Sequence, residues 1–237
     1  MRSSLAPALA MLILVAACSD ASGPPIEPPV EGADVVLDPA KDNTLFEDAD
    51  GELSNGTGQF LFAGMTRDTL SRRALVQFDV AGGGVPPGSV IDSVQLVLRM
   101  DRTIVGDIGV AIHRVTADWG EGASDADFAE GTGAQAETGD ATWVHRFYAT
   151  DNWTTPGGDF VAAPSATQTV GDVVRTYAWG STPQMVTDVQ SWLDQPASNF
   201  GWIVIADEST HTTAKRFGSR EEASANRPKL RIFYTEP

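Results

Sequence analysis

The strongest constraint on the fold is a two-residue alternation that recurs in three successive segments of the chain. Every second residue is apolar in residues 74–80, 94–100 and 108–112. This period turns apolar side chains to one face of an extended strand, as in half-buried antiparallel strands. The glycine- and proline-rich residues 82–88 separate the first two segments as a loop. The alternation therefore predicts an antiparallel all-β core.

Shorter apolar runs extend this pattern toward both ends. Residues 35–37 and 60–64 predict two further strands, and the alternation in residues 230–234 predicts a closing strand. Strands near both ends of a domain are typical of a jelly roll or a related sandwich. Because sandwiches of this size are commonly single domains, we expect one jelly-roll β-sandwich over residues 34–237.

One segment has helical periodicity instead. Residues 184–194 place an apolar stripe on one side and polar residues, Asp188 among them, on the other. The stripe consists of Met185, Val189, Trp192 and Leu193. Ser181 and Pro183 mark the start of the helix, and Pro196 forces its end. We expect one short amphipathic helix packed against the sandwich.

The segment after this helix reads as a buried strand. Residues 200–206, FGWIVIA, are apolar on both faces, which is typical of a central strand. We therefore interpret Trp192 and Trp202 as core residues rather than ligand contacts.

The amino-terminal residues have the layout of an exported lipoprotein. Arg2 supplies a short basic region, and the apolar residues 8–15 are too few for a mature transmembrane helix. The VAAC motif that ends at Cys18 resembles a bacterial lipoprotein signal, in which the cysteine becomes the acylated first residue. An ordinary secretory signal with an unrelated cysteine is the alternative. We expect a signal peptide over residues 1–17, lipid attachment at Cys18, and a place in the bacterial cell envelope, at the outer membrane or cell surface.

Residues 18–33 follow as a proline-rich linker without apolar periodicity. Extended at about 3.1 Å per residue, the linker would hold the domain roughly 45 Å from its anchor. The lipid is the membrane attachment that we expect.

Charge and cysteine content exclude several classes of function. The formal net charge of −16 argues against nucleic acid, because basic groups must neutralise the phosphates. The same charge disfavours strongly anionic glycans. With one cysteine, the chain can form neither an internal disulfide nor a thiolate metal cluster.

Catalytic motifs are missing from the sequence. It has no G-x-S-x-G elbow and no H-E-x-x-H, and its three histidines share no metal-ligand spacing. The abundant acids leave a glycosidase pair open, although any given pair is most often solvated surface. We expect a protein that is not an enzyme, and a glycan-active enzyme is the minor alternative.

Two long irregular regions are where we expect activity. Residues 118–140 are rich in glycine, alanine and acids and contain no basic residue, which predicts a surface loop because unpaired carboxylates are costly to bury. Residues 148–180 form the second region. Loops of this length tend to be functional or mobile.

Several motifs occur in the order in which one known family has them. Residues 73–79, RALVQFD, resemble the R-x-L-x-x-F-D strand of the DNRLRE-domain family, which is grouped with the carbohydrate-binding modules. The other matching pieces are PGSVIDSVQL (87–96), WGE (119–121), ATW (141–143), DVQSWL (188–193), NFGW (199–202), FGSRE (217–221) and RPKL (227–230). The resemblance covers residues 34–234.

The resemblance implies a non-catalytic β-jelly roll of secreted and cell-surface proteins, of which some members bind carbohydrate. We therefore expect a polysaccharide as the partner of this module. The alternative is a structural or adhesive surface protein that binds another protein.

Sugar binding needs flat aromatic faces beside hydrogen-bonding groups. Trp153 is the first candidate because it stands beside Asp151 and Asn152 in a glycine-containing loop. Tyr148 and Trp179 come next. Alternatively, each ring tucks under its own loop as a small core, since tryptophan is usually highly buried.

Residues 42–52 concentrate oxygen ligands in one stretch. The acids are Asp42, Glu47, Asp48 and Asp50. Such groups suit a hard divalent cation, although Phe46 stands where an EF-hand would have its first ligand. Jelly-roll sugar modules often carry a structural calcium, which favours this cofactor by analogy. A solvated acidic turn is the alternative.

Six of the sixteen basic residues gather near the carboxyl end. They are Lys215, Arg216, Arg220, Arg227, Lys229 and Arg231. They either form a patch for an anionic glycan or pair with acids, as Arg220 would with Glu221 or with acids of residues 118–140. We favour pairing because the flanking carboxylates are numerous.

Overall fold

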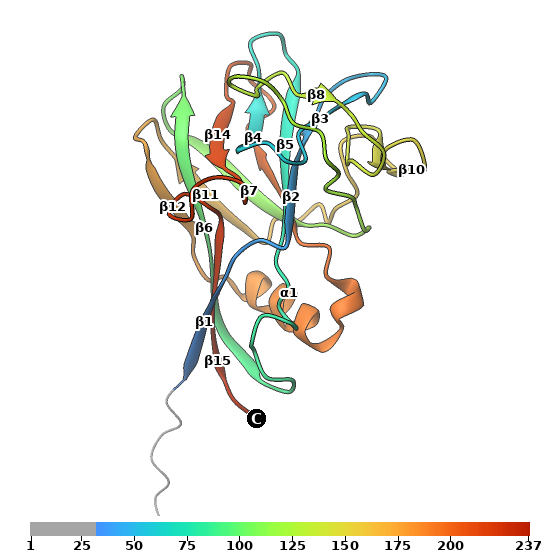
Figure 1. Cartoon of the computed structure of the whole chain (residues 1–237). Coiled ribbons are helices and arrows are strands. Elements are labelled where there is room, and N and C mark those ends of the chain that lie inside the picture. Colours follow the sequence, from blue (N-terminus) through green and yellow to red (C-terminus); the bar gives the residue numbers. More distant parts are fainter. Residues whose placement is uncertain (1–31) are drawn as a thin grey trace, which may run out of the picture. The chain divides into compact units, whose positions relative to one another are not determined.

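The longest alternating segment forms strand β6 (Val90–Thr103), on which the first sheet is built. The computed structural model describes residues 32–237, so the predicted signal peptide, Cys18 and nearly all of the linker lie outside the described residues. Antiparallel to β6 run β15 (Lys229–Thr235), β12 (Arg175–Trp179) and β14 (Lys215–Gly218), and β1 (Ala33–Leu37) extends the sheet beyond β15. Figure 1 shows β1 and β15 side by side at the lower end of the sandwich.

The second sheet is centred on β5 (Ser71–Gln77) and β13 (Trp202–Ala206), which pair with each other. Strand β2 (Lys41–Phe46) pairs with β5, β7 (Ile108–Arg114) pairs with β13, and β11 (Ala166–Val170) closes the edge beyond β7. The predicted central strand after the helix is confirmed, because β13 has a neighbour on each side and its residues are largely buried.

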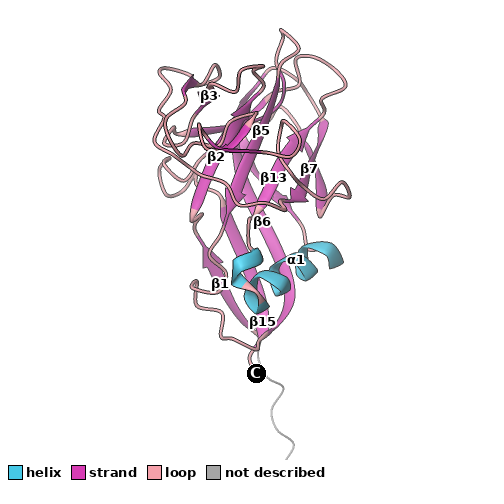
Figure 2. Ribbon diagram, turned by 90° about the vertical axis from the view of Figure 1, so that its right-hand side faces the viewer, coloured by secondary structure: helices cyan, strands magenta, loops and turns pink. Residues whose placement is uncertain are grey.

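Strand β4 (Phe60–Met65) belongs to both sheets. Its first part pairs with β14, and its last two residues, Gly64 and Met65, pair with β5. The backbone of Gly64 has φ +112°, and a Cβ there would lie 2.8 Å from the carbonyl oxygen of Thr213. Glycine is therefore required where the chain passes from one sheet to the other. The predicted fold class, an all-β sandwich with one short helix, is confirmed (Figures 1 and 2).

The remaining strands are short pieces within the loops. They are β3 (Leu53–Ser54), β8 (Ala134–Gln135), β9 (His145–Phe147) and β10 (Asp151–Asn152). They pair as β3 with β8 and β9 with β10.

The predicted helix is α1 (Pro183–Asp194), which packs its apolar stripe into the main core (Figure 2). Its amino-terminal cap is Thr182, whose side chain accepts a hydrogen bond from Met185 N, and not Ser181 as the sequence suggested. Ser181 instead accepts from Val94 N of β6. A short 3₁₀ turn, η1 (Pro196–Ser198), follows the helix, in line with the predicted stop at Pro196. Within residues 32–237 no helix is long and apolar enough to cross a membrane.

Asp188 is buried, although it was predicted to lie on the polar face of the helix. Its side chain is 0% exposed and accepts hydrogen bonds from Ser165 Oγ at 2.5 Å, Gln184 Nε2 at 2.9 Å and Trp202 Nε1 at 3.0 Å. The predicted place opposite the apolar stripe is wrong because Asp188 stands three residues after Met185 and four before Trp192, beside the stripe, where Ser165 and Trp202 donate to it. Trp192 and Trp202 are fully buried, as predicted.

Residues 148–180 are less irregular than the sequence indicated. Strands β11 and β12 both lie in this region, and β12 buries Tyr177 and Trp179. The alternation of Tyr177 and Trp179 was present in the sequence, but exposed polar residues such as Thr167 and Arg175 diluted the apolar pattern.

The acidic residues 118–140 are not uniformly solvated. Glu130 is 6% exposed, and its carboxylate accepts from Gln59 N, Phe60 N and Asn55 Nδ2. Asp140 is 0% exposed and accepts from Glu137 N at 2.7 Å. The prediction of a wholly exposed loop is wrong for these two carboxylates, because main-chain donors compensate for their burial.

Candidate functional site

Residues 115–163 pack as a layer of loops on the outer face of the second sheet. Trp119 and Trp153 anchor this layer in a second apolar core, on outward side chains of β5 and β13. Trp119 Nε1 donates to Phe200 O and Trp153 Nε1 donates to Thr142 O, each at 2.9 Å. The buried indole nitrogens are therefore satisfied and the rings hold the loops in place.

Two of the predicted sugar-contacting rings lie inside the protein. Trp153 is 4% exposed and Trp179 is 0% exposed, so neither offers a flat face to solvent. Trp153 tucks under its own loop, which was the alternative interpretation. Trp179 Nε1 donates to Val110 O at 2.8 Å within the main core. The prediction of exposed platforms is wrong for both rings.

The other three predicted contacts lie at the surface near this loop. Tyr148 is half-buried, and its ring packs edge-to-face with the His145 ring at 5.2 Å between centroids. Asp151 and Asn152 are exposed in β10, and Asp151 accepts from Arg146 Nη2 at 3.1 Å. None of these three residues lines the broad cleft beside Trp153.

That cleft has a volume of about 710 Å³ and opens directly after Trp153. Its lining residues are Arg73, Thr116, Ala117, Thr154, Thr155, Pro156, Gly158, Asp159, Phe160 and Ala162. Figure 1 places β10 and its neighbouring loops on the side of the molecule away from β6 and β12. The cleft is broad and open to solvent.

Arg73 and Phe160 form the floor of this cleft. Arg73 projects from β5 and donates to both carboxylate oxygens of Glu208, at 2.8 and 2.7 Å, and to Gly157 O at 2.8 Å. Its guanidinium lies 4.8 Å from the ring centroid of Trp143 and 5.6 Å from that of Phe160. The half-buried Phe160 ring also packs against the His113 ring, with the two ring centroids 5.3 Å apart.

Asp159 closes the loop that forms the cleft wall. Its two carboxylate oxygens accept from Thr154 N at 2.9 Å and Thr155 N at 3.0 Å. Gly157 has φ +90°, and a Cβ there would lie 2.6 Å from Arg73 Nη1, so the turn needs glycine at this position. The wall is therefore a tight, internally bonded turn.

Three threonines that line this cleft have hydroxyls without a partner among residues 32–237. Thr116, Thr154 and Thr155 are exposed, and their Oγ1 atoms make no hydrogen bond to the described protein atoms. Each hydroxyl can both donate and accept, which matches the hydroxyl groups of a sugar.

The predicted calcium ligands do not come together. Asp42 lies near the start of β2 and Glu47 follows its end, so about 16 Å of extended chain separates them. Glu47 Oε2 accepts from Ser71 N at 2.5 Å, Asp48 Oδ2 accepts from Glu52 N at 2.8 Å, and Asp50 is exposed. Residues 32–237 hold no cluster of three or more acids, histidines or cysteines arranged for a metal ion. The predicted four-acid set is therefore not assembled.

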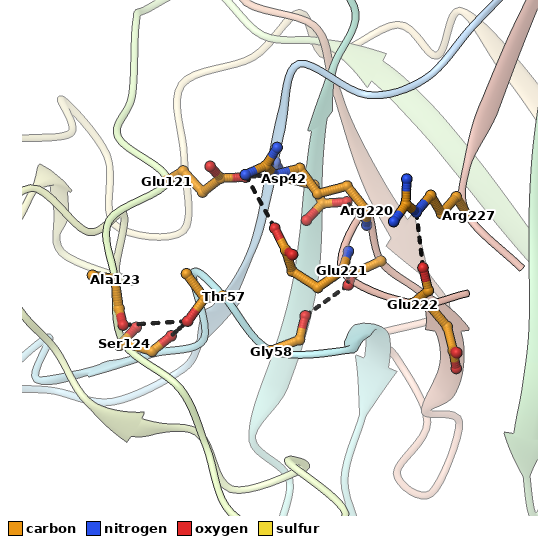
Figure 3. Close-up of polar contacts among 11 residues, drawn as sticks. Asp42, Thr57, Gly58, Glu121, Ala123, Ser124, Arg220, Glu221, Glu222 and Arg227 are labelled. Atoms are coloured by element: carbon orange, nitrogen blue, oxygen red, sulfur yellow. Dashed lines mark hydrogen bonds and ion pairs between the residues drawn. The ribbon is translucent and has the colours of Figure 1, made fainter. Parts of the chain in front are cut away.

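Asp42 is itself buried and belongs instead to a partly buried ionic cluster, shown in Figure 3. Its Oδ2 accepts from Arg220 N at 2.7 Å, and its own N–H donates to Glu121 Oε1 at 2.9 Å. Arg220 also pairs with Glu121 at 2.6 Å and with Glu221 at 3.0 Å. Burial raises the pKa of Asp42 well above its ordinary value of 3.8 and raises the pKa of Glu121, against the opposing effect of Arg220. The cluster ties three distant segments together.

Ion pairs account for four of the six basic residues near the carboxyl end, whereas Lys215 and Arg227 donate to main-chain carbonyls. Arg216 pairs with Asp101 at 2.6 Å, Arg231 pairs with Asp34 at 2.9 Å, and Lys229 pairs with Asp38. Lys215 is buried and donates to three main-chain carbonyls, and burial lowers the pKa of its ammonium. The predicted ion pairs of Arg220, with Glu221 and with an acid of residues 118–140, are confirmed.

Sequence reasoning found the loop of the cleft but not the residues that face it. Phe160 stands at the end of the same loop, seven residues after Trp153. The sequence favours Trp153 as the sugar-contacting ring because its aromatic face is larger. Arg73 lies on the outer face of β5, between two residues whose side chains turn inward. The two-residue alternation of this strand therefore indicates its orientation. Thr116 reaches the cleft through the tertiary fold, which no local pattern predicts.

In comparisons with known proteins, this chain matches neither a family model nor a curated protein.

Proposed function

We propose that this protein is a lipid-anchored cell-envelope protein whose β-sandwich binds a polysaccharide in the cleft beside Phe160. The observation that carries the proposal is the half-buried Phe160 ring, which lines an open cleft of about 710 Å³ together with three threonines whose hydroxyls have no protein partner among residues 32–237. An aromatic face packs on the apolar side of a sugar ring, while the hydroxyls exchange hydrogen bonds with it. The order of the DNRLRE-like motifs supports the same function.

The chemistry of the cleft favours a neutral chain over an anionic one. Arg73, the one basic residue of the described lining, already has both carboxylate oxygens of Glu208 as partners. Asp159 contributes a negative charge to the wall. A polyanion would therefore meet no unpaired cation in this cleft and would also approach a protein with a formal net charge of −16.

The proposed module is non-catalytic. Hydrolysis of a glycoside normally requires two carboxyl groups on either side of the bond. Asp159 is the one acid in the described lining of this cleft, and both of its oxygens are occupied by main-chain N–H groups. Binding therefore fits the site better than cleavage.

Affinity electrophoresis against a panel of neutral and acidic polysaccharides, with and without calcium, tests the proposal. We expect a neutral polysaccharide to retard the wild-type protein, and Phe160→Leu to lose most of that retardation, since leucine keeps apolar packing but removes the flat face. Phe128→Leu is the matched control, because Phe128 is fully exposed and lies outside the cleft. Lack of retardation by the whole panel, or equal retardation of Phe160→Leu and wild type, would contradict the proposal.

A protein partner is the alternative function. Val173 and Val174 are 61% and 53% exposed at the turn between β11 and β12, and so form a small apolar surface. Such a surface is common on soluble proteins and is smaller than most stable interfaces need. This alternative predicts that no polysaccharide retards the protein and that a Val173→Ser, Val174→Ser double variant loses attachment to a protein partner.

A further inference from the structure

Arg72 is a buried basic residue without an acidic partner. Its side chain is 5% exposed, and its guanidinium forms no ion pair with any acid of residues 32–237. Nη1 donates to Ser71 O at 2.9 Å, and the Nε atom is buried without a hydrogen-bond partner. The guanidinium also lies 4.9 Å from the ring centroid of Phe46. Buried guanidinium groups are normally paired, so this one has unused donors in a low-dielectric setting.

Glu47 is the acid whose charge affects the pKa of Arg72, but the two side chains are too far apart to form an ion pair. Glu47 Oε2 accepts from Ser71 N instead. Burial lowers the pKa of Arg72 to about 10, and Glu47 opposes this effect. The guanidinium therefore remains protonated at neutral pH, and its charge is uncompensated at close range.

Arg72 lines a small pocket of about 200 Å³, which lies where β4 ends and β5 begins. The apolar part of the wall is formed by Phe62, Met65 and Ile104, and the exposed Arg67 lies at the same pocket. Met65 and Arg67 belong to the end of β4 and the turn that follows, and Ile104 belongs to the turn after β6. The volume corresponds to about seven water molecules, enough for a carboxylate with a short hydrocarbon chain.

The charge of this pocket is the reverse of that of the whole protein. The chain has 32 acidic and 16 basic residues, yet the described lining of this pocket contains two arginines and no acid. Four other clefts found in residues 32–237 each contain at least one acid among their lining residues. An acid-free pocket is therefore unexpected from composition alone.

We propose that this pocket binds a small amphipathic carboxylate, with its carboxyl group on Arg72 and its hydrocarbon chain between Phe62, Met65 and Ile104. The terminal nitrogens of a planar guanidinium carry N–H groups that match the two oxygens of a carboxylate, and in Arg72 these are the contacting groups because Nε is buried. The apolar walls explain why the ligand carries a hydrocarbon group rather than being a simple inorganic anion. This site is separate from the cleft beside Phe160 and shares no described lining residue with it.

Isothermal titration calorimetry with three probes tests this site in the wild-type protein. Hexanoate supplies both the charge and the chain, acetate supplies the charge, and hexan-1-ol supplies the chain. We expect saturable binding of hexanoate, with a dissociation constant on the order of 1 mM or tighter, and at least about tenfold weaker binding of the other two. Equal binding of hexanol and hexanoate, or no binding of hexanoate, would overturn the proposal.

The variant Arg72→Met separates ligand binding from a structural role. We expect hexanoate affinity to fall by at least about tenfold, since a charged hydrogen-bonded pair is lost. We also expect an unchanged or higher melting temperature of the free protein, because the variant removes an uncompensated buried charge. Arg231→Gln, which removes an exposed arginine on β15, is the matched control and should bind hexanoate as wild type does. Wild-type affinity of Arg72→Met would contradict the proposal, and a lower melting temperature without any hexanoate binding to wild type would assign Arg72 a structural role.

A second pair of variants works even if Arg72→Met fails to fold. Ile104 is 73% exposed, so the fold tolerates changes there. Ile104→Glu places a negative charge at the pocket and Ile104→Lys places a positive one. We expect the glutamate variant to bind hexanoate about fivefold more weakly than the lysine variant. Equal affinities for the two variants would exclude a carboxylate beside this residue.

Discussion

Asp188 shows how a single polar residue is accommodated inside the apolar core. Its carboxyl group receives hydrogen bonds from three elements: the loop before β11, the helix α1 and the strand β13. Trp202 and Trp192 lie together on this core, with their ring centroids 4.6 Å apart, yet their indole nitrogens differ. Trp202 Nε1 donates to Asp188, whereas Trp192 Nε1 is buried without a partner.

We expect Trp202→Phe to destabilise the protein more than Trp192→Phe. Both rings are fully buried, so the two substitutions remove similar volumes and leave similar cavities. The difference isolates the hydrogen bond to Asp188, which is worth about 1.5–3 kcal/mol when the acceptor is charged. Chemical denaturation in urea measures both free energies of unfolding. Costs that agree within about 0.5 kcal/mol would show that this hydrogen bond contributes little.

Residue-level prediction from the sequence was successful for packing and unsuccessful for contacts between distant segments. The buried positions of Trp192 and Trp202 followed from local periodicity. The burial of Asp188 and Glu130 did not, because their donors come from residues distant in the sequence or from the main chain of another loop. Local patterns contain no record of such partners.

At the scale of elements, strong periodicity was a reliable guide and weak periodicity was not. The segments around β5, β6, β7, α1 and β13 were recognised because their apolar residues recur without interruption. The sequence did not predict β11 and β12, because each strand contains several exposed polar residues that weaken its apolar alternation. Strand β11 pairs with β7, and β12 pairs with β6. The candidate cleft depends on loops, whose conformation is set by contacts with the second sheet rather than by their own sequence.

The helix cap offers a prediction at this scale. Thr182 Oγ1 accepts from Met185 N and donates to Ser165 O, so Thr182→Ala should cost about 1–2 kcal/mol of stability. Thr187→Ala is the matched control, since Thr187 is partly exposed in the same helix and its loss should change stability by no more than about 0.5 kcal/mol. Thermal unfolding followed by circular dichroism measures both. If the two variants are equally stable, Thr182 is not the cap that positions α1.

At the scale of the whole molecule, ionic contacts join the ends of the described chain to its middle. Asp42 on β2, Glu121 in the acidic loop and Arg220 after β14 meet in one partly buried cluster, while Asp34 and Arg231 pair β1 with β15. These contacts use basic residues that would otherwise form a surface patch. The acidic surface and the paired bases together favour a neutral ligand for the cleft.

The cluster around Asp42 predicts a dependence of stability on pH. Because the folded-state pKa of Asp42 is raised, its contribution to stability is fully present below the unfolded pKa and is lost as pH rises through the folded pKa. Asparagine does not titrate and its amide oxygen can still accept from Arg220 N. The free energy of unfolding of Asp42→Asn should therefore rise relative to that of wild type as the pH increases above the ordinary value of 3.8.

Urea denaturation over a pH series measures this difference. Asp68→Asn serves as the control for the loss of one carboxylate, because Asp68 is exposed and lies outside the Asp42 cluster. A difference between Asp42→Asn and wild type that is constant, or that falls as the pH rises, would show that burial of Asp42 does not govern its titration.

Hydrogen–deuterium exchange of the protein with a retarding polysaccharide tests the central proposal most directly, because it locates the bound surface. We predict slower exchange of main-chain amides in residues 154–162 on addition of the polysaccharide, unchanged exchange at the turn of residues 66–70, and no such slowing in Phe160→Leu. Slower exchange confined to other segments, or equal slowing in Phe160→Leu, would show that the cleft beside Phe160 is not the carbohydrate site.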